Sequence, residues 1–384
     1  MQKEENTLFI NFLEYDHYII FGSGNNGLYV LEQLVKVYRI QSEKIYFTDN
    51  DKNKENILCD GVAVLNPTIA IEMEGNNLFI ISSQLYFEDI KLQLLNAGIC
   101  KNNIFVPNDI LEKSIINYRK KRFPREKLRI SFDIVEHCNL NCKSCDHFAP
   151  LSDAYYMEYE TFEKDLRRFV SLVGIEKIST ITFEGGEPLL HPLISKFISK
   201  AREICSDCEI NIISNGLLLE KMDDYFWDSL KDNSIDLFLT KYPIDIDYCE
   251  IEKKALIKGV RLDYYNDSKV VKESMHKPLD LEGKMDKYDS FMLCYLANGG
   301  CAELKNGKLY QCSMIANLHI FNNYYNYKLP VTNKDYVDIY TINDSQIILD
   351  YLCNPIPACS FCNVKKWTYD NCWGISERSI SEWS

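Results

Sequence analysis

Two series of alternating strand-like and helix-like segments constrain the fold of this chain more than any other feature. The first opens with a strand, a glycine turn and a helix at 17–38, and continues through 44–51, 77–83, 85–98 and 103–107. The second begins at 130 and keeps the same rhythm to about 266. Strands that alternate with helices imply parallel sheets, so we expect an α/β protein whose first unit is a doubly wound domain.

A basic stretch separates the two series. RKKRFPREKLR at 119–129 carries dense positive charge and a proline, and it interrupts the pattern. We therefore expect a Rossmann-like domain at 1–117, a basic linker at 118–129 and a second α/β domain at 130–285. The irregular, cysteine-rich remainder indicates a small third domain at 286–384. The basic side chains suit a diphosphate, but a solvated linker is the simpler interpretation; they are Arg119, Lys120, Lys121, Arg122 and Arg125.

The charge balance narrows the function classes. The 384 residues carry a net charge of −13, which disfavours a nucleic acid substrate. No run of eighteen apolar residues suggests a membrane span, and the first residues lack the features of a signal peptide. We therefore expect a cytoplasmic protein that acts on a small molecule.

Three cysteines lie on one short loop directly after the strand-like run at 130–137. In a long cytoplasmic chain with fifteen cysteines, metal or catalytic roles are favoured over disulfides. Cys138, Cys142 and Cys145 can hold three irons of a 4Fe–4S cubane and leave the fourth iron open. The alternatives are a zinc site that lacks its fourth ligand and a chance grouping of thiols.

This loop resembles the CxxxCxxC signature of the radical S-adenosylmethionine (SAM) superfamily, and Gly185-Gly186-Glu187-Pro188 at the end of the next strand-like run resembles the family's GGEP motif. The resemblance implies a partial (βα)6 barrel in which the open iron binds SAM and GGEP binds the SAM amino group. It also implies that an electron from a donor such as flavodoxin or ferredoxin cleaves SAM. The resulting 5′-deoxyadenosyl radical then takes a hydrogen atom from the substrate.

Further SAM contacts follow from the same resemblance. Ser214 and Asn215 are expected at the ribose, and Thr240 and Lys241 at the ribose or carboxylate. The family usually has an aromatic residue before the third cysteine, where this chain has Ser144. His147 or Phe148 is the expected substitute beside the adenine.

A second group of cysteines lies in the C-terminal part. An Asn306-Gly307 turn predicts a hairpin between two of them. The arrangement resembles the SPASM/twitch extensions of radical SAM enzymes, in a twitch-type form with one auxiliary 4Fe–4S cluster, so that the chain would hold two clusters. A zinc ribbon and structural thiols are the alternatives. The expected ligands are Cys294, Cys312, Cys359 and Cys362.

Three C-terminal cysteines remain outside this set. Cys353 and Cys372 are interpreted as structural. Cys301 lies within the expected hairpin, and we consider it as a candidate donor of a hydrogen atom to a substrate radical.

The first unit carries a dinucleotide-type fingerprint. Gly22, Gly24 and Gly27 form GxGxxG between a strand and a helix, and Asp49 ends the next strand. A nucleotide site is one interpretation, and an interaction module without a ligand is the other. The unit also resembles small Rossmann-like domains attached to surface-polysaccharide enzymes.

These patterns together favour a radical SAM enzyme for a carbohydrate or nucleotide-sugar, which it epimerises or dehydrogenates. Modification of a ribosomally made peptide is the alternative, although we see no leader-binding winged-helix unit in the sequence. A degenerate, non-catalytic module is disfavoured by the intact cysteine loop and GGEP motif.

Overall fold

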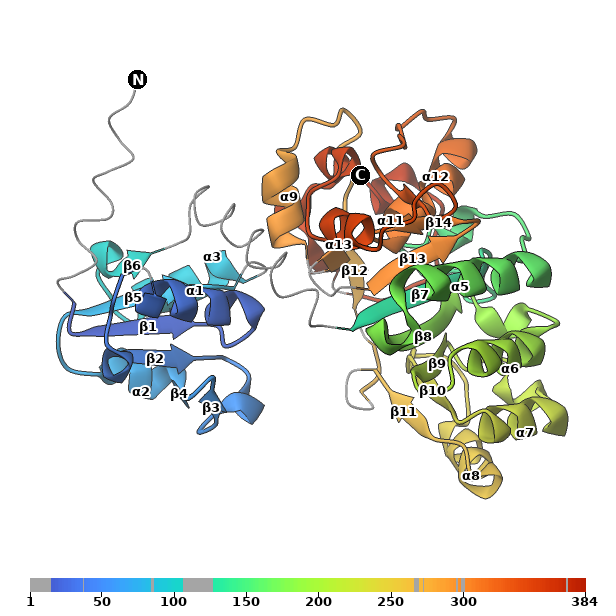
Figure 1. Cartoon of the computed structure of the whole chain (residues 1–384), viewed down its shortest axis with the longest axis horizontal. Coiled ribbons are helices and arrows are strands. Elements are labelled where there is room, and N and C mark those ends of the chain that lie inside the picture. Colours follow the sequence, from blue (N-terminus) through green and yellow to red (C-terminus); the bar gives the residue numbers. More distant parts are fainter. Residues whose placement is uncertain are drawn as a thin grey trace. The chain divides into compact units, whose positions relative to one another are not determined.

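The computed structural model describes most of the chain in two compact units, residues 1–121 and 122–384. Figure 1 shows the elements of each unit. The described residues are 15–36, 38–83, 86–105, 127–265, 269–271, 273–294, 296–297, 301–370 and 372–384.

The N-terminal unit is built around a six-stranded sheet in the order β3-β4-β2-β1-β5-β6. All neighbours are parallel except β3 and β4. Strand β1 is central, and the chain adds strands first on one side of it and then on the other. The strands are β1 (His17–Phe21), β2 (Ile45–Thr48), β3 (Leu58–Cys59), β4 (Val62–Leu65), β5 (Asn77–Ile81) and β6 (Ile104–Phe105), and the helices are α1 (Asn25–Lys36), α2 (Pro67–Glu72) and α3 (Phe87–Asn96).

The second unit contains an eight-stranded sheet in the order β11-β10-β9-β8-β7-β13-β14-β15. From β7 to β11, each strand lies parallel to the previous one, and a helix connects each pair. The elements of this series are β7 (Leu128–Val135), α5 (Tyr159–Val173), β8 (Ile178–Gly185), α6 (Ile194–Ile204), β9 (Glu209–Ser214), α7 (Asp224–Asp232), β10 (Ile235–Leu239), α8 (Tyr248–Lys258) and β11 (Leu262–Tyr264). The chain is thus an α/β protein with two mixed, mostly parallel sheets, as expected.

The C-terminal residues continue the same sheet beyond β7. Strand β13 (Cys301–Lys305) runs parallel to β7, and β14 (Lys308–Tyr310) and β15 (Val337–Asp338) add antiparallel strands. Asn306 and Gly307 both have positive φ, as a two-residue type I′ turn requires, and this confirms the predicted hairpin. The remaining elements are β12 (Ser274–His276), which pairs with β16 (Thr368–Asp370), and the helices α9 (Lys287–Leu293), α11 (Ser313–Ala316), α12 (Leu318–Tyr325) and α13 (Gln346–Leu352).

The two faces of the larger sheet differ in polarity. Ile130, Phe132 and Ile134 of β7 join the main apolar core, on the face along which α5, α6 and α7 lie in Figure 1. Because successive strand residues point to opposite faces, Ser131 and Asp133 occupy the other face. That face is polar across three neighbouring strands, with the buried side chains of Ser131, Asp133, Thr180, Thr182, Glu303 and Lys305.

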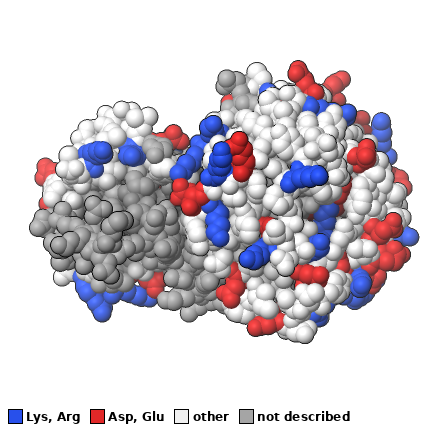
Figure 2. Space-filling model, turned by 90° about the horizontal axis from the view of Figure 1, so that it is seen from above, with Lys and Arg blue, Asp and Glu red and all other residues white. Residues whose placement is uncertain are grey.

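None of the helices within the described ranges combines the length and apolar character that crossing a bilayer demands. On the face drawn in Figure 2, basic and acidic side chains are interspersed among the described residues.

Candidate functional site

The three-cysteine loop begins directly after the carboxyl end of β7. Cys138, Cys142 and Cys145 are all partly buried. Asn141 and Ser144, between them, adopt left-handed φ of 54° and 58°. This conformation is unusual for residues other than glycine and recurs at functional sites, and here it folds the loop back on itself within seven residues.

The surroundings of the sulfurs suit a bound cluster. The Cys138 sulfur accepts hydrogen bonds from the backbone N–H of Leu140 at 3.4 Å and from Asn215 Nδ2 at 3.6 Å. Burial raises the pKa of Cys138 to about 11 and that of Cys142 to about 12, so the free thiols stay protonated at neutral pH. A metal would displace these protons.

The donor set of the loop fits an iron–sulfur cubane. Three thiolates on one short loop can each bind one iron of a 4Fe–4S cluster, and one corner is then left without a cysteine ligand.

The GGEP motif packs directly against the start of the cysteine loop. Gly186 N–H donates to the Val135 carbonyl at 2.7 Å, and a Cβ on Gly186 would lie 2.0 Å from the His137 carbonyl oxygen. Glycine is needed here because backbone meets backbone. The motif thus positions the residues that lead into Cys138.

The Glu187 carboxylate is hydrogen-bonded by other groups of the protein. Its buried carboxylate accepts hydrogen bonds from Leu189 N at 3.1 Å, Ser214 Oγ at 2.8 Å and Asn215 N at 2.9 Å. Burial raises its pKa to about 7. The GGEP motif, the Ser214–Asn215 segment and Cys138 therefore lie together. A SAM ammonium group that binds Glu187 would be a fourth donor to a carboxylate that already accepts three hydrogen bonds.

The other residues that were expected to contact SAM differ in whether they lie beside the site. Thr240 N–H donates to the Ser214 carbonyl at 3.1 Å, which places Thr240 beside the site. The Lys241 ammonium instead lies 4.8 Å and 5.0 Å from the ring centres of Tyr248 and Tyr264. Phe148 is fully buried in an apolar cluster with residues of the C-terminal part, including Phe321 and Trp383, so it is already packed by the protein itself.

Sequence reasoning missed two aromatic residues at the cysteine loop. Tyr242 and Trp373 pack with ring centres 5.4 Å apart, and both lower the pKa of Cys142 against the larger effect of burial. Tyr242 directly follows the expected pair Thr240–Lys241. Nothing in the sequence pointed to Trp373, because it lies far from the cysteine loop along the chain.

A buried charged network lies on the polar face of the sheet, beside the loop. Lys305 Nζ contacts Glu136 Oε1 at 2.7 Å and Asn317 Oδ1, and Asn317 in turn donates to Asp133. His147 Nε2 lies 3.5 Å from Asp133 Oδ1. The network thus connects the end of β7 with the loop after Cys145.

The pKa values in this network reflect its charges. Burial opposes the ionisation of Glu136, but His319 and Lys305 hold its pKa at about 2. Burial alone would lower the pKa of His147, yet Asp133 and Asp146 hold it well above the ordinary value. Burial, with Asp133 nearby, raises the pKa of Glu303 well above that of a free glutamate.

A cavity of about 580 Å³ opens at the Glu136 end of this network. It lies between the β13–β14 hairpin, the start of α12 and residues 151–155. Charged, aromatic and amide side chains share its lining, among them Glu136, Tyr155, Lys305, Tyr310, His319 and Asn323. Its size suits a small molecule.

The four expected C-terminal ligands come together from three segments. Burial raises the pKa of the Cys362 thiol well above its ordinary value, and Cys312, Cys359 and Cys294 raise it further. Such mutual effects require the four sulfurs to be near one another. These four thiols are a donor set that fits either a 4Fe–4S cluster or a zinc ion.

Cys301 begins β13, and its side chain lies outside the described positions. Its backbone pairs with Arg129, near the start of β7. The cysteine loop follows the opposite end of β7, about 20 Å away at about 3.3 Å per residue. This placement is unfavourable for the expected transfer of a hydrogen atom. Cys353 is buried and Cys372 exposed.

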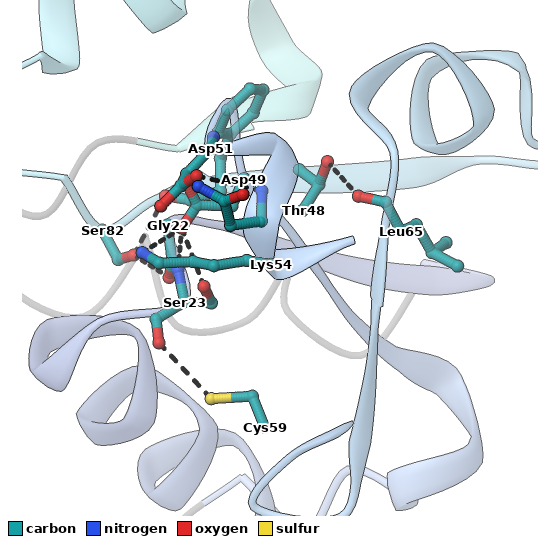
Figure 3. A network of polar contacts seen from close by, with 11 residues as sticks. Gly22, Ser23, Thr48, Asp49, Asp51, Lys54, Cys59, Leu65 and Ser82 are labelled. Carbon is teal, nitrogen blue, oxygen red and sulfur yellow. Dashed lines mark hydrogen bonds and ion pairs between the residues drawn. The ribbon is translucent and has the colours of Figure 1, made fainter. Parts of the chain in front are cut away.

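The N-terminal glycine loop connects β1 with α1, and Asp49 lies against it (Figure 3). A Cβ on Gly27 would lie 2.0 Å from the Gly22 carbonyl oxygen, whereas a Cβ on Gly24 would meet nothing within 4 Å. Asp49 Oδ2 accepts hydrogen bonds from Ser23 N at 2.9 Å, Ser23 Oγ at 2.7 Å and Lys54 Nζ at 3.0 Å. The carboxylate expected at a ribose is thus bound to the loop itself, while the space above Gly24 is open. The basic cluster at 119–125 lies outside the described residues.

Comparison with known proteins agrees with the loop geometry. Residues 128–242 match the family described as "4Fe-4S single cluster domain". The chain is 30% identical over 94 residues to the GTP 3′,8-cyclase of Helicobacter pylori and 38% identical over 100 residues to that of Clostridium acetobutylicum, spans that cover 24% and 25% of this chain and 29% of each relative. It is 26% identical over 151 residues to an S-adenosylmethionine-dependent nucleotide dehydratase of Lacinutrix mariniflava, which covers 39% of this chain and 30% of the relative. The chain therefore spans less than a third of the length of these relatives.

Solved structures with similar chain traces include BtrN in complex with AdoMet and 2-DOIA, with a TM-score of 0.39 and 17% identity over 62% of this chain and 94% of that one. Native anSMEcpe with bound AdoMet gives a TM-score of 0.36 and 14% identity over 61% of this chain and 83% of that one.

Proposed function

We propose that this chain, whose residues 128–242 match the family described as "4Fe-4S single cluster domain", is a radical SAM enzyme that removes a hydrogen atom from a small carbohydrate or nucleotide-sugar. The observation that carries the proposal is that three segments of the chain meet at the carboxyl ends of β7, β8 and β9. The cysteine loop, Gly185–Pro188 and Ser214–Asn215 are joined there by hydrogen bonds through Glu187 and Asn215.

The residues of the chain would hold the cofactors in defined ways. Cys138, Cys142 and Cys145 would bind the first cluster, and Asn215 would donate to the Cys138 ligand. Backbone groups of Gly185–Pro188 and of Ser214, Asn215 and Thr240 would face SAM. When bound, the cluster supplies the electron that cleaves SAM and so yields the hydrogen-abstracting 5′-deoxyadenosyl radical.

The cavity beside Glu136 supports a small polar substrate. Glu136 lies two residues before Cys138, so the cavity adjoins the loop. Its carboxylate and amide side chains suit sugar hydroxyls, and its tyrosine rings suit the C–H faces of a sugar ring. Nucleotide-linked substrates gain support from the relatives, two of which are named for GTP and one for a nucleotide.

Dehydrogenation is the reaction that we favour over epimerisation. An epimerase needs a hydrogen-atom donor at the substrate, and Cys301 begins β13 at the end of the sheet far from the cysteine loop. A dehydrogenase instead removes a hydrogen atom from an alcohol carbon, a proton from its hydroxyl oxygen and an electron from the resulting radical, which leaves a carbonyl. Cys294, Cys312, Cys359 and Cys362 would hold the auxiliary cluster as the acceptor of that electron.

Anaerobic reconstitution tests the proposal. The wild-type chain should bind about eight irons and convert SAM to 5′-deoxyadenosine under reduction. Alanine at Cys138, Cys142 and Cys145 together should abolish cleavage and leave about four irons. Alanine at the exposed Cys100, Cys249 and Cys372 is the matched control and should cleave SAM normally.

Transfer of deuterium from the substrate to 5′-deoxyadenosine tests the substrate class. A substrate deuterated at the reacting carbon should pass deuterium into 5′-deoxyadenosine. Transfer from a sugar or nucleotide-sugar would support the proposal, whereas transfer only from a peptide would contradict it. Full SAM cleavage by the Cys138/Cys142/Cys145 variant would contradict the cluster assignment itself.

A further inference from the structure

A group of carboxylates and one histidine lies on the polar face of the larger sheet and includes none of the cysteine ligands. Asp133, His147 and Glu184 each offer one ligand atom, and these atoms all lie within 4.8 Å of one another. Asp133 and Glu184 are paired in register on β7 and β8, and His147 belongs to the loop after the third cysteine. Three separate segments thus bring three side chains of metal-binding type to one point.

The ring of His147 is oriented by its other nitrogen. His147 Nδ1 lies 3.2 Å from Asp146 Oδ1, and Asp146 in turn contacts Lys277 Nζ. Because a carboxylate only accepts hydrogen bonds, Nδ1 carries the proton and Nε2 can keep a lone pair. His147 Nε2 lies 3.5 Å from Asp133 Oδ1 and makes no hydrogen bond among the described residues. Histidines that bind metals typically donate their second ring N–H to a carboxylate in this way.

A fourth side chain, Glu303 of β13, points to a ligand at the same place. Asp133 and Glu303 are each 1% exposed, and Asp133 Oδ1 and both Glu303 carboxylate oxygens have no hydrogen-bond partner in the described part of the chain. Glu303 is paired in register with Ser131 of β7, so it shares the polar face with Asp133. Burial, and after it the charge of Asp133, raises the pKa of Glu303, as expected for neighbouring carboxylates. Buried carboxylate oxygens without partners indicate a ligand.

The ammonium groups near these side chains are engaged elsewhere. Lys305 Nζ contacts Glu136 Oε1 at 2.7 Å, and Lys277 Nζ contacts Asp146. Within the described ranges, no lysine or arginine forms an ion pair with the side chains here called the carboxylate–histidine group, which are Asp133, His147, Glu184 and Glu303. Three carboxylates therefore share one imidazole. Such an excess of negative charge in a buried place is costly unless a cation binds to it.

The spacing and chemistry of the carboxylate–histidine group suit a divalent metal ion. Donor atoms at about 2.1 Å from an octahedral ion lie about 3.0 to 4.2 Å from one another, which the observed spacing below 4.8 Å allows. Carboxylate oxygens suit Mg²⁺ and Mn²⁺, and imidazole nitrogen suits transition metals, so the mixed set favours Mn²⁺ over Mg²⁺. Thiolates select softer metals, so Mn²⁺ also distinguishes this group from the cysteines.

We propose that Asp133, His147, Glu184 and Glu303 form a binding site for one divalent cation of the Mn²⁺ type. Asp146 orients the histidine ligand through its Nδ1–H group. The site goes beyond the function proposed above and does not depend on it, because none of its ligands is a cluster cysteine.

Titration of the reconstituted full-length chain with Mn²⁺ tests the site, with the iron–sulfur clusters oxidised so that Mn²⁺ dominates the EPR spectrum. The sharp signal of free Mn²⁺ should disappear until one ion per chain is bound, and the bound ion should show hyperfine coupling to one histidine nitrogen. Asp133→Asn and Glu184→Gln should each weaken the affinity at least about tenfold. Asp146→Asn should weaken it by about 10–100-fold, because it removes the orienting carboxylate.

Asp165→Asn is the matched control, because Asp165 is also a buried carboxylate but is bound by Tyr340 Oη and Gly307 N–H. Its Mn²⁺ affinity should equal that of the wild type, and an equal loss in this control would overturn the assignment. Wild-type affinity in both Asp133→Asn and Glu184→Gln would also overturn it.

The wild-type chain decides the question even if a variant fails to fold. No tightly bound Mn²⁺, or bound Mn²⁺ without coupling to a histidine nitrogen, overturns the site. A chain that binds Mn²⁺ as expected but never cleaves SAM would keep the site and overturn the proposed function alone, so the two failures are distinguishable.

Discussion

Gly186→Ala tests whether the GGEP motif supports the cysteine loop through close backbone contact. The added Cβ would lie 2.0 Å from the His137 oxygen, 2.3 Å from the His137 carbonyl carbon and 2.7 Å from the Glu136 oxygen. Non-bonded carbon atoms prefer separations of about 3.5–4.0 Å, so the two backbones must separate by roughly 1.5 Å. Because all three contacts are with backbone, no side-chain rotation relieves the overlap.

The expected cost is large enough to measure. Overpacking typically costs about 1–3 kcal/mol, and a contact with backbone belongs at the upper end, about 3 kcal/mol. For a unit of this size, each kcal/mol lowers the melting temperature by about 2–4 °C, which gives roughly 6–12 °C. Since His137 precedes Cys138, the same displacement should reduce iron uptake on reconstitution.

The assay compares circular-dichroism melting of the cluster-free protein and iron content after reconstitution. Gly374→Ala is the matched control, because a Cβ there would meet nothing within 4 Å although Gly374 also contacts the loop through its carbonyl. If Gly186→Ala melts with Gly374→Ala and takes up the same iron, the steric reasoning is refuted.

Three other predictions follow from the described contacts. Burial raises the pKa of Glu187 from 4.5 to about 7, so the folded carboxyl keeps a proton that the unfolded chain releases, and its contribution to stability falls as pH rises through this window; urea midpoints at several pH values should show a flatter slope for Glu187→Gln, and an unchanged slope would contradict the assignment. Cys301→Ala should form the same oxidised product as the wild type without solvent deuterium at the reacting carbon, and an epimer that vanishes in this variant would restore Cys301 as the donor. Gly24→Val should weaken binding of a nucleotide-sugar such as UDP-glucose to the N-terminal unit, measured by calorimetry; equal affinity would leave an interaction module.

The sequence was sufficient for the features that depend on local pattern. The strand before Cys138, the glycines of both motifs and the Asn306–Gly307 hairpin all follow from short stretches whose backbone requirements are legible in the residue types. The placement of β13 beside β7 did not follow, because it joins residues about 170 positions apart and the alternation of Glu303 and Lys305 with apolar neighbours fits either face of a sheet.

The same limit applies within the site. Phe148 was a reasonable candidate for the adenine because it is aromatic and close to Cys145 in sequence, yet the C-terminal core buries it. Lys241 could be placed at a strand end, but its rotamer depends on Tyr248 and Tyr264, which belong to other elements. Glu187 was identified, and its three donors come partly from β9, which only the folded sheet brings near.

The contacts between the cysteine loop and residues 373–383 also set the order of events during synthesis. Cys145 and Trp383 are 238 residues apart, so at about 5–20 residues per second the ribosome needs roughly ten to fifty seconds to make these residues after it has made the loop. During that interval the thiols of Cys138, Cys142 and Cys145 lack the contacts that residues 373–383 later make with their loop. Iron delivered before residues 373–383 are made would meet an open loop, and a chain truncated before Trp373 has ligands that stay uncovered and accessible to oxidants.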